Sequence, residues 1–345
     1  GRAAEAAEAA GTLVRLAPKS VDALWELASA EVALGREESA IATLERAFVL
    51  PEGPPRVSAR LDELVRRRAA ELSDRGDHEA ALACNRRARE LVPEDPARPL
   101  AIARSLHALT RSQEALDVLR QNLKVHAAHG GSWLLLGRLY TEAGYAREAV
   151  DAYRKASTAD LPAPERLLAL TGLGFACAEG DLRDEAITAL LRAAELAPED
   201  AKLKAKLADL YEAAGKRDES IQALLDLRAL RGLVPEEQRR LGLLCAVAER
   251  HDEAAAALTA ALAKWPGDAS LLEPLSVALE ALGRDADATR ILLRLRDAAP
   301  GHQSASSRLG FAYARLGQHA EAAAAFEVAR AKEAPRAELL TALVA

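Results

Sequence analysis

The chain has 345 residues, a formal net charge of −6 and a pI of about 5.8. Its basic and acidic residues are interspersed without a lysine- or arginine-rich stripe, so nucleic acid is not expected as a main partner. Hydrophobic residues make up 50% of the chain, yet no apolar run reaches the roughly 18 residues of a membrane-spanning helix. We therefore expect no membrane insertion within this segment.

Alanine dominates the composition, with 80 residues, whereas aromatic residues contribute only 3%. This balance favours closely packed helices over sheets, which prefer β-branched and aromatic side chains. The sequence starts at Gly1 and contains no methionine, so we expect it to be a segment of a longer protein. A size prior of about 150 residues per domain suggests two domains, but internal repetition indicates a single array instead.

The first predicted element, residues 1–20, is the second helix of a truncated repeat and ends at Pro18. From Val21 to residue 336 we expect nine repeats, most of them 34 residues long, each forming a pair of antiparallel helices. They begin near residues 21, 62, 96, 130, 167, 201, 235, 269 and 303. Residues 337–345 are expected to begin a further helix. The prediction is an all-α solenoid of antiparallel helix pairs.

Extra residues lie between the first two blocks. They follow a proline-rich loop, and the apolar residues Val57, Leu61, Leu64 and Val65 continue a helical pattern across them. We therefore expect the first helix of the second block to be lengthened over Pro55–Leu61.

Small residues recur at two places in every block. The eighth positions are Ala28, Ala69, Ala103, Gly137, Gly174, Ala208, Gly242, Ser276 and Gly310. The twentieth positions are Ala40, Ala81, Ala115, Ala149, Ala186, Ser220, Ala254, Ala288 and Ala322. Because the distance between packed helices depends on side-chain size, these positions predict a close crossing within each pair.

Glycines mark the end of the first helix in six blocks, where a left-handed cap is expected. They are Gly35, Gly76, Gly144, Gly215, Gly283 and Gly317. Prolines follow the second helix in several blocks. They are Pro18, Pro93, Pro198, Pro266 and Pro300.

The block from Gly130 to Pro162 carries the fullest motif. It contains W-x-x-L-G-x-x-Y-x-x-x-G followed by A-x-x-x-Y-x-x-A and a proline. This pattern resembles a tetratricopeptide repeat, and the frame recurs along about 90% of the chain. The resemblance implies a right-handed superhelix whose first helices line a concave groove that binds a partner protein or peptide.

Residues that carry chemistry give little support for catalysis. The cysteines Cys84, Cys177 and Cys245 form no disulfide or zinc pattern, and unpaired cysteines slightly favour the cytoplasm. Cys177 and Cys245 are expected to be small buried hydrophobic residues. His126 and His129 could share a metal, but no third ligand is fixed nearby, so neither a metal nor another cofactor is expected. No nucleophile or phosphate-binding motif is present, and we predict a non-catalytic chain.

The remaining histidines His78, His251 and His319 share one place in their blocks, where we expect an exposed turn between helices. His129 and His302 share the last place, between repeats, and are expected to be exposed there as well.

The predicted groove consists of the second, fifth, ninth and twelfth residues of each block, which form one helical stripe. The candidate partner-binding residues on this stripe are Trp25, Arg66, Arg104, His107, Arg138, Phe175, Arg239, Leu243 and Phe311. The stretch from Arg66 to Arg138 combines arginines with apolar residues, a composition typical of interaction hot spots. It predicts an acidic or amphipathic protein segment as partner. The alternative is that these arginines are solvated or paired with nearby acidic residues.

Phe175 and Phe311 also suggest binding, because a groove phenylalanine lacks core burial unless a neighbouring repeat covers it. The two asparagines, Asn85 and Asn122, fall on second helices. This placement disfavours the carboxylate-clamp members of the family, which hold chaperone tails with asparagines on first helices. Asparagine-ladder glycosyltransferase scaffolds lose support for the same reason.

Two function classes fit these features. In the first, the chain is an interaction scaffold without catalysis. In the second, it is an accessory or regulatory region of a larger envelope-export, motility or enzyme assembly whose chemistry lies elsewhere. Arginine outnumbers lysine by about four to one, which suggests a bacterial source with a GC-rich genome.

Overall fold

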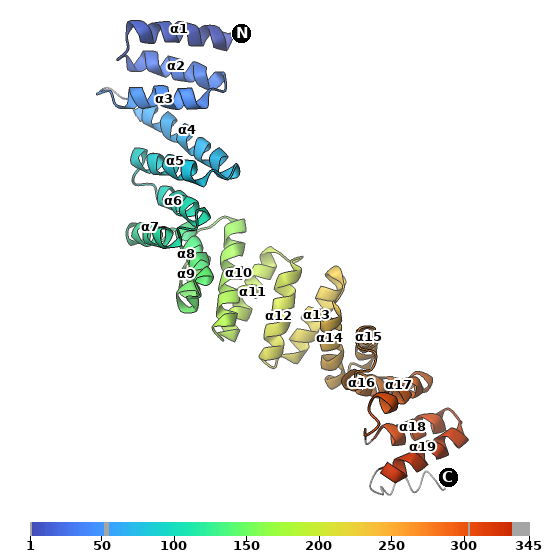
Figure 1. Ribbon diagram of the computed structural model, residues 1–345. Coiled ribbons are helices and arrows are strands. Elements are labelled where there is room, and N and C mark those ends of the chain that lie inside the picture. Colours follow the sequence, from blue (N-terminus) through green and yellow to red (C-terminus); the bar gives the residue numbers. More distant parts are fainter. Residues whose placement is uncertain (1, 52–54, 303, 333–345) are drawn as a thin grey trace. The chain divides into compact units, whose positions relative to one another are not determined.

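The computed structural model describes residues 2–51, 55–302 and 304–332. Every regular element within these ranges is an α-helix, and the chain divides into two compact units, Gly1–Leu182 and Arg183–Ala345 (Figure 1). The all-α repeat architecture expected from the sequence is confirmed. The further helix expected at residues 337–345 lies outside the described residues.

In the part of unit 1 that the structure describes, ten helices pack in chain order, each against the next. They are α1 (Arg2–Leu16), α2 (Val21–Ala33), α3 (Glu37–Phe48), α4 (Pro55–Asp74), α5 (His78–Leu91), α6 (Ala97–Ala108), α7 (Ser112–Val125), α8 (Gly130–Glu142), α9 (Ala146–Thr158) and α10 (Ala163–Glu179). The first helices α6, α8 and α10 also contact one another in succession. This row of first helices positions the candidate site.

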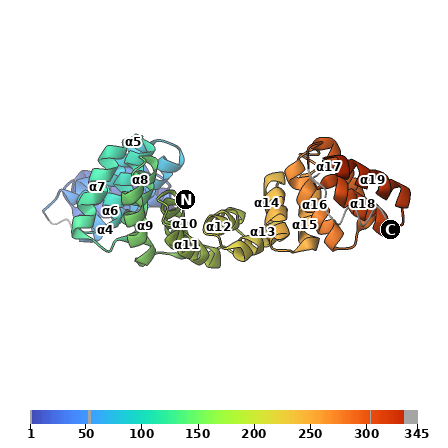
Figure 2. The same cartoon turned by 90° about the horizontal axis from the view of Figure 1, so that it is seen from below.

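Unit 2 follows the same plan and contains nine helices within the described residues (Figure 2). They are α11 (Arg183–Leu196), α12 (Ala201–Ala213), α13 (Arg217–Arg231), α14 (Pro235–Val247), α15 (His251–Ala261), α16 (Ala269–Ala281), α17 (Asp285–Ala298), α18 (Ala305–Arg315) and α19 (His319–Lys332). Consecutive helices pack together here too, and α14 additionally contacts α16.

The turns after first helices adopt the left-handed conformation expected of their caps. All six predicted glycines have positive φ values, between 68° and 81°. Three residues that are not glycine take the same conformation at the corresponding turns, namely Thr110, Asp181 and Glu249. Because a Cβ atom makes this conformation costly, the turn geometry is imposed by the helix pair and not by glycine alone.

The close crossing of paired helices rests on the small eighth position, which faces a large side chain of the second helix. A Cβ placed on Gly137 would lie 2.8 Å from the Tyr153 ring, and one on Gly310 would lie 2.5 Å from Phe326. Gly242 meets Leu258 in the same way, at 2.6 Å. These glycines are therefore required by packing, since no side chain fits between the helices.

Two first helices are longer than the others. Helix α4 spans 20 residues from Pro55, which confirms the expected lengthening, and α10 spans 17 residues from Ala163. The second extension adds a turn ahead of Leu167, where the sequence placed the block start. The division of the chain into nine repeats stays a prediction.

Several polar and sulfur-containing residues are buried between helices. Cys177 and Cys245 are fully buried, as predicted. Asn85 on α5 donates to the Ser105 hydroxyl at 3.0 Å, and Asn122 on α7 donates to the Ser132 hydroxyl at 2.9 Å. Both asparagines thus join a second helix to the first helix that follows it.

None of the described helices combines the length and apolar character needed to cross a membrane.

The histidines occupy more structured positions than exposed turns. His78, His251 and His319 are the first residues of α5, α15 and α19. The His129 ring is half-buried and lies 2.8 Å from the Ser132 hydroxyl, and burial lowers its pKa. The expectation of an exposed loop histidine is wrong for His129 because this hydroxyl, at the start of α8, fixes the ring. It is also wrong for His302, whose side chain is 20% exposed and lies 3.3 Å from Glu273.

Candidate interaction surface

Three of the sequence-predicted residues meet in unit 1. Arg104 and His107 lie on α6 and Arg138 lies on α8. Both arginines line a hollow of about 230 Å³. Helices α6 and α10 flank α8, which supplies Leu134 and Leu135 to the hollow. The predicted helical stripe therefore assembles into a real concavity at this point.

Tyr153 of α9 forms part of the lining and is held from two sides. Gly137 of α8 and Gly172 of α10 both lie against its ring, at a distance that leaves no room for a Cβ atom. A Cβ on Gly172 would come within 2.5 Å of the ring. Burial raises the pKa of Tyr153, so its hydroxyl stays protonated at neutral pH. Leu168 of α10 completes the apolar lining and is largely exposed.

The arginines of this hollow are paired with carboxylates. Arg104 contacts Glu165 of α10 at 3.4 Å, and Arg138 contacts Glu142 at 2.9 Å. The His107 Nε2 atom lies 3.5 Å from Glu142 as well. The two arginine side chains nevertheless remain 58% and 65% exposed, so much of each guanidinium faces solvent.

Arg66 does not belong to this hollow. It pairs with Asp62 on α4 at 3.0 Å, and Asp62 also contacts Arg98 of α6 at 2.9 Å. The Asp62 and Arg98 side chains are 7% and 11% exposed, whereas Arg66 is 48% exposed, so Arg66 lies at the solvent edge of a charge cluster between two first helices. The structure therefore shows Arg66, Arg104 and Arg138 paired with nearby acidic residues, which was the alternative interpretation of these arginines.

The predicted aromatic residues are only partly covered. Trp25 packs against the core of α2–α4, and the Arg56 guanidinium lies 5.1 Å from its ring centroid. Phe175 on α10 is 36% exposed. In unit 2, Phe311 on α18 is 38% exposed and meets Phe326 of α19 edge-on, with ring centroids 5.0 Å apart. The second helix of the same pair thus covers one side of Phe311.

The other two predicted residues of unit 2 serve packing. Arg239 lies over Trp265, with its guanidinium carbon 5.7 Å from the ring centroid, and Leu243 packs against the unit's core. Among the described residues, no three histidine, cysteine, aspartate or glutamate side chains are grouped closely enough to hold a metal ion.

The acidic residue that pairs with Arg104 and two of the residues that line the hollow were not identified from the sequence. Glu165 lies in the added turn of α10, ahead of the predicted block start. Leu168 is the second residue of its block, a groove position, but it was not named among the candidate residues. Tyr153 belongs to the repeat motif but was not among the predicted groove residues. The three extra residues before Leu167 were the available signal, since an added helical turn brings new side chains to the α8 face.

Tetratricopeptide repeat profiles match residues 1–55 and 205–269, residues 130–161 and residues 305–333. No curated protein matches the chain in sequence.

Solved structures similar to the chain include three helical-repeat proteins. "Functional Characterization of Pseudomonas Aeruginosa pilF" describes one that is 19% identical, with a TM-score of 0.48 over 63% of this chain and 97% of that one. YrrB, described as a TPR protein with an unusual peptide-binding site, is 20% identical, with a TM-score of 0.47 over 58% and 97%. MamA is 23% identical, with a TM-score of 0.39 over 49% and 93%.

The matched profiles together cover just over half of the chain and fall in both units. They agree with the helix pairs, the glycine turns and the small crossing positions of the structure. The chain therefore belongs to the tetratricopeptide repeat family, whose helical repeats serve as protein-interaction scaffolds.

Proposed function

We propose that unit 1 binds an acidic, amphipathic segment of a partner protein in the hollow between α6, α8 and α10. The observation that carries the proposal is the combination of two exposed arginines, Arg104 and Arg138, with an apolar lining in one concavity. An apolar side chain of the partner would enter the hollow and contact Leu134 and Leu168. Carboxylates beside it would bind the two guanidiniums.

The ion pairs of Arg104 with Glu165 and of Arg138 with Glu142 do not prevent partner carboxylates from binding the two guanidiniums. Exposed pairs of this kind contribute about 0–1 kcal/mol, because both charges remain well hydrated. Each guanidinium also carries five N–H donors, and a single carboxylate occupies at most two of them. A partner carboxylate can therefore join Arg104 or displace Glu165 at little cost. Bidentate recognition of carboxylates is a specific property of arginine, so lysine would be a poor substitute.

The direct test is affinity capture with the chain, followed by mass spectrometry to identify the partner. The variant Arg104→Glu/Arg138→Glu is expected to weaken capture by about tenfold or more, because two attractive contacts become repulsive. Arg147→Glu on α9 is a matched control, since this exposed arginine lies outside the hollow. It should leave capture unchanged.

Two results would contradict the proposal. The first is unchanged capture by the double variant when circular dichroism shows native helix content. The second is loss of capture by Phe311→Ala alone, which would place the partner on unit 2.

A further inference from the structure

A second hollow, of about 430 Å³, lies in unit 2 on a different set of helices. It is lined by Thr259 of α15, by Leu275 and Leu279 of α16, and by one face of α17. The unit 1 hollow is lined mainly by first helices, whereas α15 and α17 are both second helices. The two surfaces therefore occupy different faces of the repeat.

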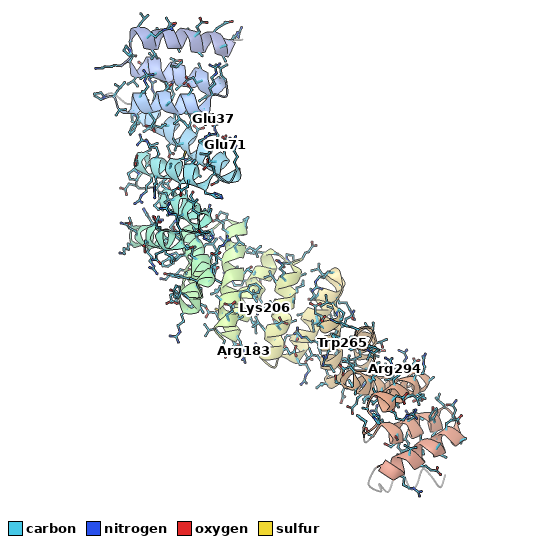
Figure 3. The ribbon with its side chains drawn as sticks, in the orientation of Figure 1. Glu37, Glu71, Arg183, Lys206, Trp265 and Arg294 are labelled. Carbon is cyan, nitrogen blue, oxygen red and sulfur yellow. The ribbon has the colours of Figure 1, made fainter. Side chains whose placement is uncertain are left out.

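The charges around this second hollow are unequal. Arg284, Arg290 and Arg294 line it, and Asp287 is the one acidic residue in the lining (Figure 3 labels Arg294). Asp287, Arg290 and Arg294 stand on one face of α17 because their spacings of three and four residues match the helical repeat. The lining thus carries an excess of positive charge.

Asp287 holds two of the arginines in place. Arg284 donates to it through Nε at 3.0 Å and through a terminal nitrogen at 2.6 Å, and Arg290 binds its other oxygen. These bonds lower the pKa of Asp287. Arg294 donates to the Pro266 carbonyl at 2.6 Å. The three guanidiniums are therefore oriented in advance, which lowers the entropic cost of binding a ligand.

Free donors remain on the arginines after these contacts. The Arg284 and Arg290 side chains are 56% and 76% exposed, and each guanidinium has more N–H groups than its bonds to Asp287 use. Between them, the half-buried Ile291 presents an apolar contact. The hollow thus offers anion donors around a small apolar patch.

We propose that this α17 hollow is a second docking surface, which binds an acidic peptide segment of a partner protein through Arg284, Arg290 and Arg294. Charge complementarity selects this occupant, since carboxylates match the arginine forks. A membrane surface fits less well, because interfacial binding needs protruding apolar side chains. Here Leu275 and Leu279 are almost completely buried.

The test uses the full chain and a short fluorescein-labelled peptide rich in glutamate and leucine, with fluorescence anisotropy as the readout. The same peptide with glutamine in place of glutamate is the neutral probe. Arg290→Glu/Arg294→Glu is expected to weaken binding of the acidic probe at this surface by about tenfold or more. Arg290→Gln/Arg294→Gln should weaken it by a smaller factor, and the neutral probe should bind poorly to every variant.

Arg296→Glu is the matched control, because it reverses a charge on α17 outside the hollow. Arg296→Glu should leave binding of the acidic probe unchanged. If it weakened binding as much as the double variant does, the loss would be an effect of net charge, and the inference would be overturned. Circular dichroism and thermal unfolding establish that each variant is folded.

The unit 1 variant Arg104→Glu/Arg138→Glu separates the two proposals. If both surfaces bind the probe, the wild-type chain binds two peptide molecules and each double variant binds one. If only the unit 1 variant lowers binding, the present inference fails while the proposed function stands. Loss in the α17 variant alone supports the α17 surface and counts against the hollow in unit 1. Phosphatidylserine vesicles give a further outcome. If the vesicles bound through Arg290 and Arg294 and the peptide did not bind, the ligand of this surface would be a lipid membrane, and the inference would be overturned.

Discussion

The two arginine-lined hollows of this chain are built in different ways. In unit 1, the arginines come from α6 and α8, the carboxylate Glu165 comes from α10, and Tyr153 of α9 is held between two glycines. In unit 2, three arginines and the aspartate that orients two of them come from α17 and the residue before it. The first surface needs four helices to pack correctly, whereas the second needs mainly the spacing of one helix.

This difference teaches where each surface is vulnerable. A packing defect in unit 1 should remove its hollow together with its stability. The spacing of Asp287, Arg290 and Arg294 on one face of α17 depends mainly on the helix itself, so a packing defect in unit 2 should disturb this row less.

Cysteine alkylation allows the two units to be followed separately. Burial raises the pKa of the Cys245 thiol in unit 2 from 9.0 to about 11, which lowers its thiolate fraction at pH 8 by about a hundredfold. Cys84 in unit 1 is only partly buried, and burial also raises its pKa. Iodoacetamide should modify Cys84 in the native chain and Cys245 only when unit 2 opens, as mass spectrometry can measure. Equal rates at the two sites would show that unit 2 is open in the native state.

Gly172→Val should destabilise unit 1 by about 1–3 kcal/mol, the usual cost of overpacking, because Gly137 on the other side blocks retreat of the Tyr153 ring. Urea unfolding measures the loss, and binding at the unit 1 hollow should weaken with it. Gly11→Val is the matched control, since nothing lies within 4 Å of its Cβ position on α1. It should change stability by less than about 0.5 kcal/mol. Similar losses of stability in both variants would contradict the close packing of the Tyr153 ring between Gly137 and Gly172.

Thr110→Gly should stabilise unit 1 by about 1 kcal/mol, because a β-branched residue at φ 60° is strained where glycine is not. The reciprocal change, Gly144→Thr at the next turn, should destabilise by a similar amount, since the space is open but φ is 76°. Thermal unfolding of the pair checks both signs. A loss of stability in Thr110→Gly would mean that the threonine side chain supports the turn.

Removing an internal carboxylate should strengthen acidic-probe binding at each surface. Glu165→Gln in unit 1 and Asp287→Asn in unit 2 each delete a competitor, and exposed pairs predict gains of about twofold to fivefold. Asp287 also orients its arginines, so its gain should be the smaller of the two. Anisotropy titrations measure both affinities. A loss of affinity in Asp287→Asn would show that orientation outweighs competition at α17.

Several features could be predicted from the sequence because they depend on residues close together in the chain. Helical periodicity, the left-handed turn at Gly35 and Gly144, and the small crossing position at Gly137 all follow from local spacing. The buried Cys177 and Cys245 followed from their place in the repeat. The placement of Arg104 and Arg138 on first helices could be predicted for the same reason.

Tertiary structure decided the features that depend on which helices meet. It paired Arg104 with Glu165, 61 residues away, and it placed Arg66 in a separate charge cluster with Asp62 and Arg98. It also brought Arg284, Arg290 and Arg294, from α17 and the residue before it, to a hollow that α15 and α16 help to line. A repeat pattern determines the face on which a side chain lies. The charge partner of that side chain depends on helix lengths and crossing distances, which only the packed units establish.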